Sequence, residues 1–258
     1  MGAGQLSILG RIPLARAAAA SARRALMHQR VTREYREFAG RAAIERPDLP
    51  VKDEERFFCL DNRTATTPFD SHYVYHTAWA TRGLAARRPA QHVDIASSVY
   101  FVALASAIVP VEHLDYRPPA LVLPNVTCRG GDITALPYAD DSVHSLSCMH
   151  VIEHIGLGRY GDPIDPRGDV AAAAELARIL APGGWFYFVV PVGRPRVCFN
   201  AHRVYDVPAV QRLFPGLTIR ESALVPDDAS RGLIENPSSA LVAQQQYGCG
   251  CFAMQKAS

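Results

Sequence analysis

The stretch GDITALPYADDSVHSLSCMHVIEHIGLGRYGDPIDP, residues 131–166, decides the fold. Its apolar run from Val143 to Ile152 has only small or weakly polar interruptions, which is typical of a short strand buried on both faces. The segment that follows is rich in glycine and proline and is expected to be irregular. Ionisable groups such as Glu153 and His154 therefore come just after the carboxyl end of a core strand. Because ligands of open α/β sheets bind at that edge, the stretch predicts a ligand site.

Apolar runs and helical stretches alternate along the rest of the chain. The pattern predicts strands at 92–97, 111–116, 126–134, 143–151, 185–192, 217–225 and 248–254. It predicts helices at about 72–88, 98–109, 168–180 and 207–214, with Ser71 as a cap of the first and Ala181–Gly184 as a turn after the third. Strands that alternate with helices of this length favour an α/β fold with a mostly parallel sheet.

Size, charge and cysteine usage limit the class of protein. A chain of 258 residues with 48% hydrophobic content can bury a full core, so we expect one domain, residues 57–258, after an extension, residues 1–56. A net charge of only +2 gives no indication of nucleic-acid binding. The six cysteines are scattered, which favours a reducing compartment, and we expect a cytoplasmic protein. Cys249 and Cys251 are expected in a glycine-containing strand, because they are too close for an ordinary disulfide and lack the second pair of a zinc site.

The beginning of the chain is basic. Residues 1–33 contain six arginines and no acidic residue, and Ala15 to Leu26 favours a helix. Three interpretations remain open: an organelle transit peptide, a segment with weak contact to an anionic membrane surface, or a loosely packed helical extension. The longest apolar run, Val99 to Val111, is too short to span a bilayer.

Three aspartates end successive predicted strands. Asp94 ends the first strand, Asp115 comes 21 residues later at the end of the second, and Asp132 ends the third. An acidic residue at that second position accepts hydrogen bonds from ribose hydroxyls in nucleotide-binding βαβ units. Asp132 is placed to accept from an adenine amino group, with Ile133 packed on the ring. The alternative for each aspartate alone is a capping role in a helix or turn.

A family resemblance joins these residues. Asp94, Asp115, Gly131-Asp132, LPYADDSV (136–143), HVIEH (150–154) and FYFVVPV (186–192) resemble the class I S-adenosylmethionine (SAM) dependent methyltransferases over about residues 90–225. More narrowly, EHIGLGRYGDPIDP (153–166), FNAHRVY (199–205) and YGCGCF (247–252) resemble an uncharacterised subfamily, a domain of unknown function. The resemblance implies a Rossmann-like, seven-stranded sheet, mostly parallel with an antiparallel last strand. It also implies SAM as cofactor, bound by Asp94, Ala96, Ser97, Ser98, Asp115, Asp132, Ile133 and His150.

One motif departs from the family. Class I methyltransferases have D-x-G-x-G-x-G after the first strand, whereas this chain has Asp94-Ile95-Ala96-Ser97-Ser98-Val99-Tyr100. Glycine allows close approach of the ligand and positive φ, and alanine or serine restricts both. Ser97 and Ser98 compensate in part if one of them caps the next helix. The alternative function is therefore a methyltransferase fold with a degenerate loop, used for binding or for a hydrolytic or metal-assisted reaction.

The acceptor site is expected after the fourth and fifth strands. Methyl transfer needs positioned reactants and a general base, so His154, His202 and Asp162 are the catalytic candidates. The expected substrate is a polar small molecule, sugar or glycan that is methylated on oxygen. Its predicted binding residues are polar side chains near the same sheet edge: Glu153, Arg159, Tyr160, Asp165, Asn200 and Arg203. No metal is expected, because the four-residue spacing of His150 and His154 has no meaning in a strand followed by a loop.

Overall fold

The computed structural model describes residues 11–257, with side chains from residue 18 onward. The chain divides into two compact units, Met1–Pro68 and Phe69–Ser258. The transit or membrane-surface role predicted for residues 1–33 falls partly on residues 1–10, which lie outside the described range. No helix within residues 11–257 is long and apolar enough to cross a membrane.

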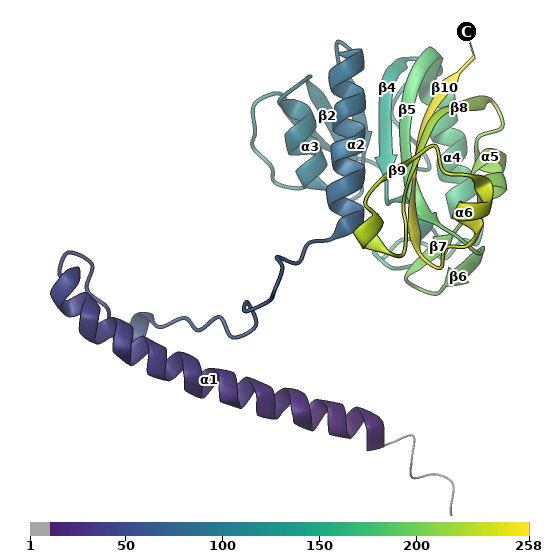
Figure 1. The fold of residues 1–258 in the computed structure, drawn as a ribbon. Coiled ribbons are helices and arrows are strands. Elements are labelled where there is room, and N and C mark those ends of the chain that lie inside the picture. Colours follow the sequence, from purple (N-terminus) through teal and green to yellow (C-terminus); the bar gives the residue numbers. More distant parts are fainter. Residues whose placement is uncertain (1–10, 258) are drawn as a thin grey trace, which may run out of the picture. The chain divides into compact units, whose positions relative to one another are not determined.

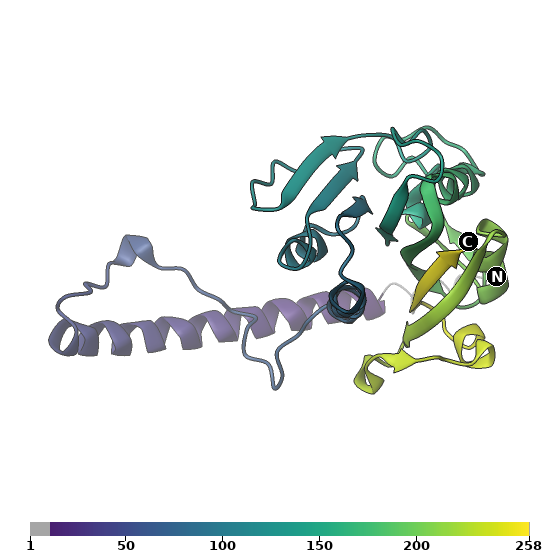
Figure 2. The same cartoon turned by 90° about the horizontal axis from the view of Figure 1, so that it is seen from above.

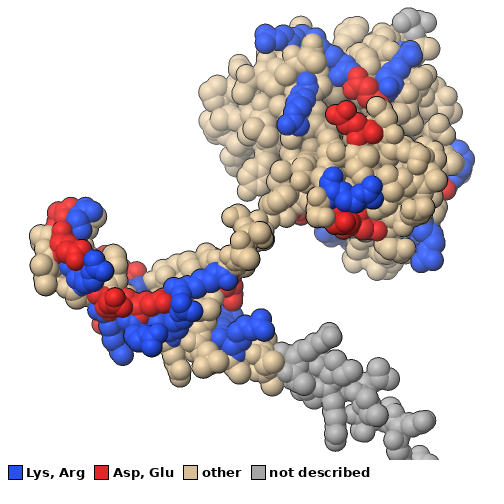
Figure 3. Space-filling view, in the orientation of Figure 1, with Lys and Arg blue, Asp and Glu red and all other residues tan. Residues whose placement is uncertain are grey.

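The first unit is a long helix with an extended return segment. Helix α1 (Arg11–Glu45) is followed by a single turn, η1 (Asp53–Glu55). The return segment packs on the helix through Phe58, whose ring centroid lies 5.5 Å from that of His28, and through Asp53, which accepts a 2.6 Å hydrogen bond from Tyr35. Basic and acidic side chains are interleaved on the face of this unit seen in Figure 3. Glu34 pairs with both Arg30 and Arg63. The excess of positive charge in residues 1–33 is therefore partly neutralised within this unit.

The second unit is built on one large twisted sheet (Figure 1). Its eight strands have the order β3-β2-β1-β4-β5-β10-β8-β9. The five parallel strands are β1 (His92–Ile95), β2 (Val111–Asp115), β3 (Val126–Gly130), β4 (Val143–Met149) and β5 (Leu180–Val192). Strand β10 (Gly248–Lys256) runs antiparallel between β5 and β8 (Leu217–Val225). This arrangement confirms the predicted sheet, and the extra strand is β9 (Ile234–Glu235), a two-residue strand on the edge.

Helices cover both faces of the sheet (Figure 2). Helices α2 (Ser71–Arg87) and α3 (Val99–Ser106) pack on one face, and α4 (Gly168–Ile179) and α5 (Val207–Leu213) on the other, with the short α6 (Ser239–Ala243) beside α5. The alternation of side chains along β5 explains the two layers, since Phe186 and Phe188 join the core under α4 and α5 while Tyr187 and Val189 join the core under α2 and α3. Strand β5 is therefore buried on both faces, as its continuous apolar sequence predicts.

Polar caps fix where the helices begin. Asp70 accepts from the backbone N–H of Tyr73 at 3.2 Å at the start of α2, so this residue and not Ser71 is the cap. Ser98 accepts from the N–H of Phe101 at 3.3 Å at the start of α3. Each such bond satisfies one of the free N–H groups of a first turn and contributes about 1 kcal/mol. The Ser98 cap matters for function because it sets the direction of the chain just after β1.

Three local features differ from the sequence prediction. Residues 181–184, expected as a turn, lie within the bounds of β5, where the pairing with β4 shifts register between Val143 and Ser145. Strand β3 ends at Gly130, so Asp132 lies in the following turn and not in the strand. Ile152–His154, expected as the start of a loop, forms one 3-10 turn, η2. A separate hairpin of β6 (Arg196–Cys198) and β7 (His202–Val204) follows β5.

Candidate active site

A pocket of about 320 Å³ lies at the carboxyl ends of the parallel strands. Its walls come from the ends of β1 and β2, the turn after β3, the residues after β4, and the loop from His154 to Gly168. The sheet order reverses between β1 and β4, and open α/β sheets bind ligands at such a reversal. The predicted residues that line the pocket are Ala96, Asp115, Asp132, Ile133, His150, His154, Tyr160, Asp162 and Asp165.

Two carboxylates lie on one wall of this pocket. Asp115 accepts a 2.7 Å hydrogen bond from the N–H of Arg117 through Oδ1, and Asp132 accepts a 2.8 Å bond from the N–H of Thr134 through Oδ1. These local bonds fix each side chain. In each case Oδ2 has no hydrogen-bond partner within residues 18–257 and is available to a ligand. The buried side chain of Ile133 provides an apolar surface beside them.

Asp94 does not line the pocket and instead supports the turn beneath it. Its carboxylate is fully buried and accepts from the N–H of Ser97 at 3.1 Å, from Nδ1 of His113 at 2.7 Å, and from the hydroxyl of Ser147. Burial disfavours ionisation of both Asp94 and His113, but the hydrogen bond between them and their opposite charges outweigh it. The pKa of Asp94 is therefore lowered and the pKa of His113 is raised. The pair is an ion pair that anchors the end of β1 to β2.

In the turn after β1, an alanine adopts a left-handed backbone conformation that is usual for glycine. Ala96 has φ +54°, and its N–H donates to the carbonyl of Leu114 at 2.8 Å. Ala96 is one of the residues that line the pocket. The two serines do not line the pocket, because Ser97 Oγ accepts from the N–H of Met149 at 3.1 Å and Ser98 caps α3. The two serine hydroxyls, which were expected to compensate for the missing glycines of the family motif, therefore accept hydrogen bonds from backbone N–H groups of the protein itself.

The loop from His154 to Gly168 is organised by one carboxylate. Asp162 accepts from the N–H groups of Gly156, Gly158 and Tyr160 at 2.7, 3.3 and 3.2 Å. Burial alone would raise the pKa of Asp162, but these three backbone donors lower it. With both oxygens bound to backbone, Asp162 shapes the loop and is poorly placed to act as a base. Tyr160, held by the same loop, stacks under the guanidinium of Arg117 at 4.6 Å.

A buried carboxyl group lies next to His150, which lines the pocket. Glu153 is 1% exposed, and its Oε1 lies 2.9 Å from Nδ1 of His150. Its other oxygen, Oε2, is buried and has no hydrogen-bond partner within residues 18–257. Burial raises the pKa of Glu153 to about 7. Glu153 was expected to bind substrate, but it does not line the pocket and instead contacts the side chain of His150, which does.

His154 reaches the pocket in a defined orientation. Its Nδ1 donates to the carbonyl of Ala201 at 2.6 Å, which leaves Nε2 with a free lone pair. Burial lowers the pKa of His154, although Glu153 at 3.7 Å opposes this effect. The imidazole is therefore neutral near pH 7 and is able to accept a proton at Nε2.

Besides Asp94, Ser97, Ser98 and Glu153, four more of the predicted site residues lie outside the pocket wall. Arg203 is buried and donates to the carbonyl of Ile155 at 2.6 Å, so it holds the loop. Arg159 donates to the carbonyl of Ala201 at 2.9 Å. Asn200 is exposed, and the ring of His202 packs on that of Tyr247 with centroids 4.6 Å apart. Only loop support and packing are observed for this group.

A cluster of rings that was not predicted from the sequence lies beside His150. His72 stacks on His150 and on Tyr247 with centroids 5.6 and 5.3 Å apart, and His76 meets His150 edge-on at 5.1 Å. Burial lowers the pKa of His72 to about 4, of His76 to about 3 and of His150 to about 4. One signal was available, because His72 and His76 are four residues apart in a predicted helix and therefore share a face. Their meeting with His150 and Tyr247 depends on tertiary packing.

Comparisons with known proteins address the fold. No curated protein matches the chain. A family described as Caenorhabditis protein of unknown function, DUF268, matches residues 137–223. Among solved structures, the YcgJ protein from Bacillus subtilis has a TM-score of 0.51 at 13% identity and covers 72% of this chain and 99% of its own. The N-methyltransferase NodS from Bradyrhizobium japonicum, solved with S-adenosylhomocysteine, has a TM-score of 0.50 at 15% identity and covers 72% of this chain and 87% of its own. The second unit therefore has the fold of a SAM-dependent methyltransferase.

Proposed function

We propose that the chain is a SAM-dependent methyltransferase and that the pocket at the carboxyl edge of the sheet binds SAM. The observation that carries the proposal is the pair Asp115 and Asp132. Both carboxylates line one pocket wall, both are held by a local hydrogen bond, and both keep one oxygen free. A carboxylate at the end of the second strand accepts from two ribose hydroxyls, and a second one beside an apolar residue suits an adenine ring.

The pocket fits the nucleoside half of SAM. Its volume of about 320 Å³ lies at the lower end of small-molecule sites. Asp115 would hold the ribose, Asp132 the adenine amino group, and Ile133 one face of the ring. The turn at Ala96 would face the methionyl half. When bound, SAM supplies an electrophilic methyl group, and the remaining requirements fall on this chain.

For methyl transfer, side chains of this chain would have to orient the acceptor and remove its proton. His154 lines the pocket and has its Nδ1–H fixed on the carbonyl of Ala201, so Nε2 accepts a proton from an acceptor hydroxyl. Tyr160 and Asp165 line the same pocket and offer hydrogen bonds to a polar substrate. We therefore propose methylation on oxygen of a polar small molecule, sugar or glycan, with His154 as the base.

A second candidate function is favoured by one observation. The methyl group of Ala96 occupies the position where the family has a glycine, and it narrows the approach of a ligand to the turn. A protein that binds a nucleoside there without transferring a methyl group is consistent with this turn. Binding measurements separate the two functions.

The test is calorimetric titration of the full chain with SAM and with S-adenosylhomocysteine. We expect binding of both, and Asp115→Ala is expected to weaken it at least about 10-fold, the value of one lost hydrogen bond to a charged group. Glu235→Gln is the matched control, because Glu235 is an exposed carboxylate on β9, outside the pocket wall. Absence of heat with either ligand from a folded sample would reject a SAM site.

Turnover is tested against a panel of sugars and small polar alcohols by release of S-adenosylhomocysteine. We expect His154→Gln to lower turnover by about 10²-fold or more while it leaves S-adenosylhomocysteine affinity within a few-fold. Binding without turnover on any acceptor of the panel would favour the second candidate function.

A further inference from the structure

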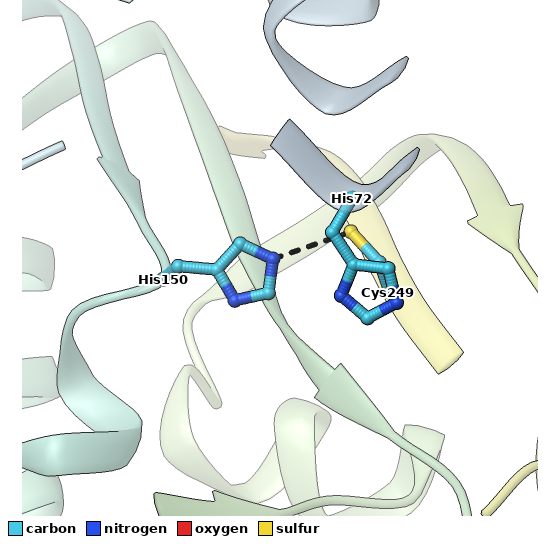
Figure 4. Close-up of side chains that lie close together, drawn as sticks. All are labelled: His72, His150 and Cys249. Carbon is cyan, nitrogen blue, oxygen red and sulfur yellow. Dashed lines mark hydrogen bonds between the residues drawn. The ribbon is translucent and has the colours of Figure 1, made fainter. Parts of the chain in front are cut away.

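Three potential metal ligands from distant parts of the second unit meet beside the pocket. His72 comes from the first turn of α2, His150 from the end of β4, and Cys249 from β10. One ligand atom of each lies within 4.8 Å of the other two. Figure 4 shows the imidazole of His150 directed toward the Cys249 sulfur, with Nε2 at 3.4 Å from Sγ.

The spacing of these atoms suits a shared tetrahedral ion. Bonds of about 2.3 Å to sulfur and about 2.0 Å to nitrogen place two ligand atoms of a tetrahedral zinc ion roughly 3.5 Å apart. The separation of 3.4 Å between His150 Nε2 and Cys249 Sγ is close to that value. The ligand atom of His72 lies within 4.8 Å of the other two, so binding of the ion requires this third atom to move closer.

The surroundings of the cluster support the same interpretation. Glu153 holds Nδ1 of His150 at 2.9 Å, which directs Nε2 toward the sulfur. A carboxylate that binds the second nitrogen of a ligating histidine is a common outer partner of zinc sites. Nε2 of His76, whose ring meets that of His150 edge-on, is buried and has no partner within residues 18–257. Buried polar atoms are seldom left unpaired, and a water molecule bound to the ion would supply a hydrogen bond to it.

We propose that His72, His150 and Cys249 bind a zinc ion, with Glu153 as the outer partner of His150. Two imidazoles and one thiolate suit zinc better than magnesium or calcium, which prefer oxygen ligands. Three protein ligands leave one tetrahedral position for water or for an atom of a substrate. Because His150 also lines the pocket, the ion lies at its boundary, where it is placed to hold the acceptor oxygen. Only this last role rests on the proposed methyltransferase function.

The test uses the full chain, purified without a metal-affinity step. We expect about one zinc ion per chain to survive dialysis, and cobalt(II) in its place is expected to give the near-ultraviolet absorption of a thiolate–cobalt bond. Cys249→Ser is expected to abolish that absorption and to weaken zinc binding at least 10-fold. This is roughly the smallest loss of affinity that follows the mutation of a group supporting a metal site. Cys148→Ser is the matched control, because Cys148 is an equally buried thiol on β4 of the same sheet and belongs to no such cluster among the residues described. Glu153→Gln keeps an acceptor for His150 and is expected to weaken binding by about 10–100-fold.

The outcomes are decisive for folded proteins, as verified by tryptophan fluorescence. No thiolate absorption in the unchanged chain, or equal absorption in the Cys249→Ser protein, would overturn the proposal. Calorimetry with S-adenosylhomocysteine on the zinc-free chain keeps the two proposals apart. Zinc binding without nucleoside binding would reject the SAM site alone, and nucleoside binding without zinc would reject the metal site alone.

Discussion

Replacement of Ala96 by glycine is expected to stabilise the second unit. Ala96 has φ +54°, a left-handed conformation that costs a residue with a side chain about 1–2 kcal/mol. Glycine avoids that cost but gives the unfolded chain extra freedom worth roughly 0.5–1 kcal/mol. The expected net gain is therefore about 0.5–1 kcal/mol, which corresponds to a rise in Tm of about 1–4 °C for a unit of this size.

The matched control is the same substitution at Ala107. This exposed alanine follows α3 with φ −73°, so glycine brings only the unfolded-state cost there. Ala107→Gly is expected to lower stability by about 0.5–1 kcal/mol. The unfolded-state cost is common to both variants, and the difference between them isolates the left-handed penalty.

The assay is equilibrium unfolding in urea, followed by tryptophan fluorescence. Both tryptophans of the chain, Trp79 and Trp185, lie in the second unit, so the signal reports that unit alone. Calorimetry on the same samples is expected to show tighter S-adenosylhomocysteine binding by Ala96→Gly, because a methyl group leaves the pocket wall. If Ala96→Gly destabilised the unit as much as Ala107→Gly does, the account of this turn would be refuted.

Two further predictions concern the loop and the buried ion pair. Gly156→Ala is expected to destabilise the second unit by about 1–3 kcal/mol and to weaken S-adenosylhomocysteine binding, because its Cβ would lie 2.0 Å from the carbonyl oxygen of Asp165 at φ +79°. Gly161→Ala has a similar φ of +87° and no atom within 4 Å, so unfolding and calorimetry should show a smaller effect, and equal effects would argue against the clash. The His113 pKa is raised by Asp94, so this pair stabilises fully below pH 6.5 and its contribution is lost as the pH rises through the folded-state pKa. Tm measured from pH 6.5 upward should fall more steeply in the unchanged chain than in His113→Asn, and parallel curves would contradict an ion pair.

The local pattern of the sequence was sufficient for most of the fold. Side chains alternate between the two faces of a strand, so a continuous apolar run such as 185–192 is buried fully only if both faces of the sheet are covered. In a parallel sheet, helices on each side provide that cover. Asp115 is the last residue of β2 and Asp132 lies in the turn after β3, and parallel strands bring their carboxyl ends to one edge. Their place in the pocket is therefore a consequence of chain order, and it was predictable.

Only the tertiary structure decided what the other candidates do. Asp94 also lies at the carboxyl-terminal half of its strand, yet the packing of His113 and Ser147 against it makes it a buried anchor. Asp162 is bound by three backbone N–H groups because the loop folds around it. In both cases the sequence shows the carboxylate but not the groups that surround it, and those groups determine whether it meets a ligand.

The cluster of His72, His150 and Cys249 shows the same limit most clearly. Each residue has an ordinary local setting, in a helix, after a strand and within a strand, and His150 is 99 residues from Cys249. Periodicity records which face of an element a residue shares with its neighbours in sequence. It does not record which other element packs on that face. The sequence by itself determined the sheet and the line of carboxylates at its edge, whereas the meeting of two imidazoles and a thiol was decided by how α2, β4 and β10 pack together.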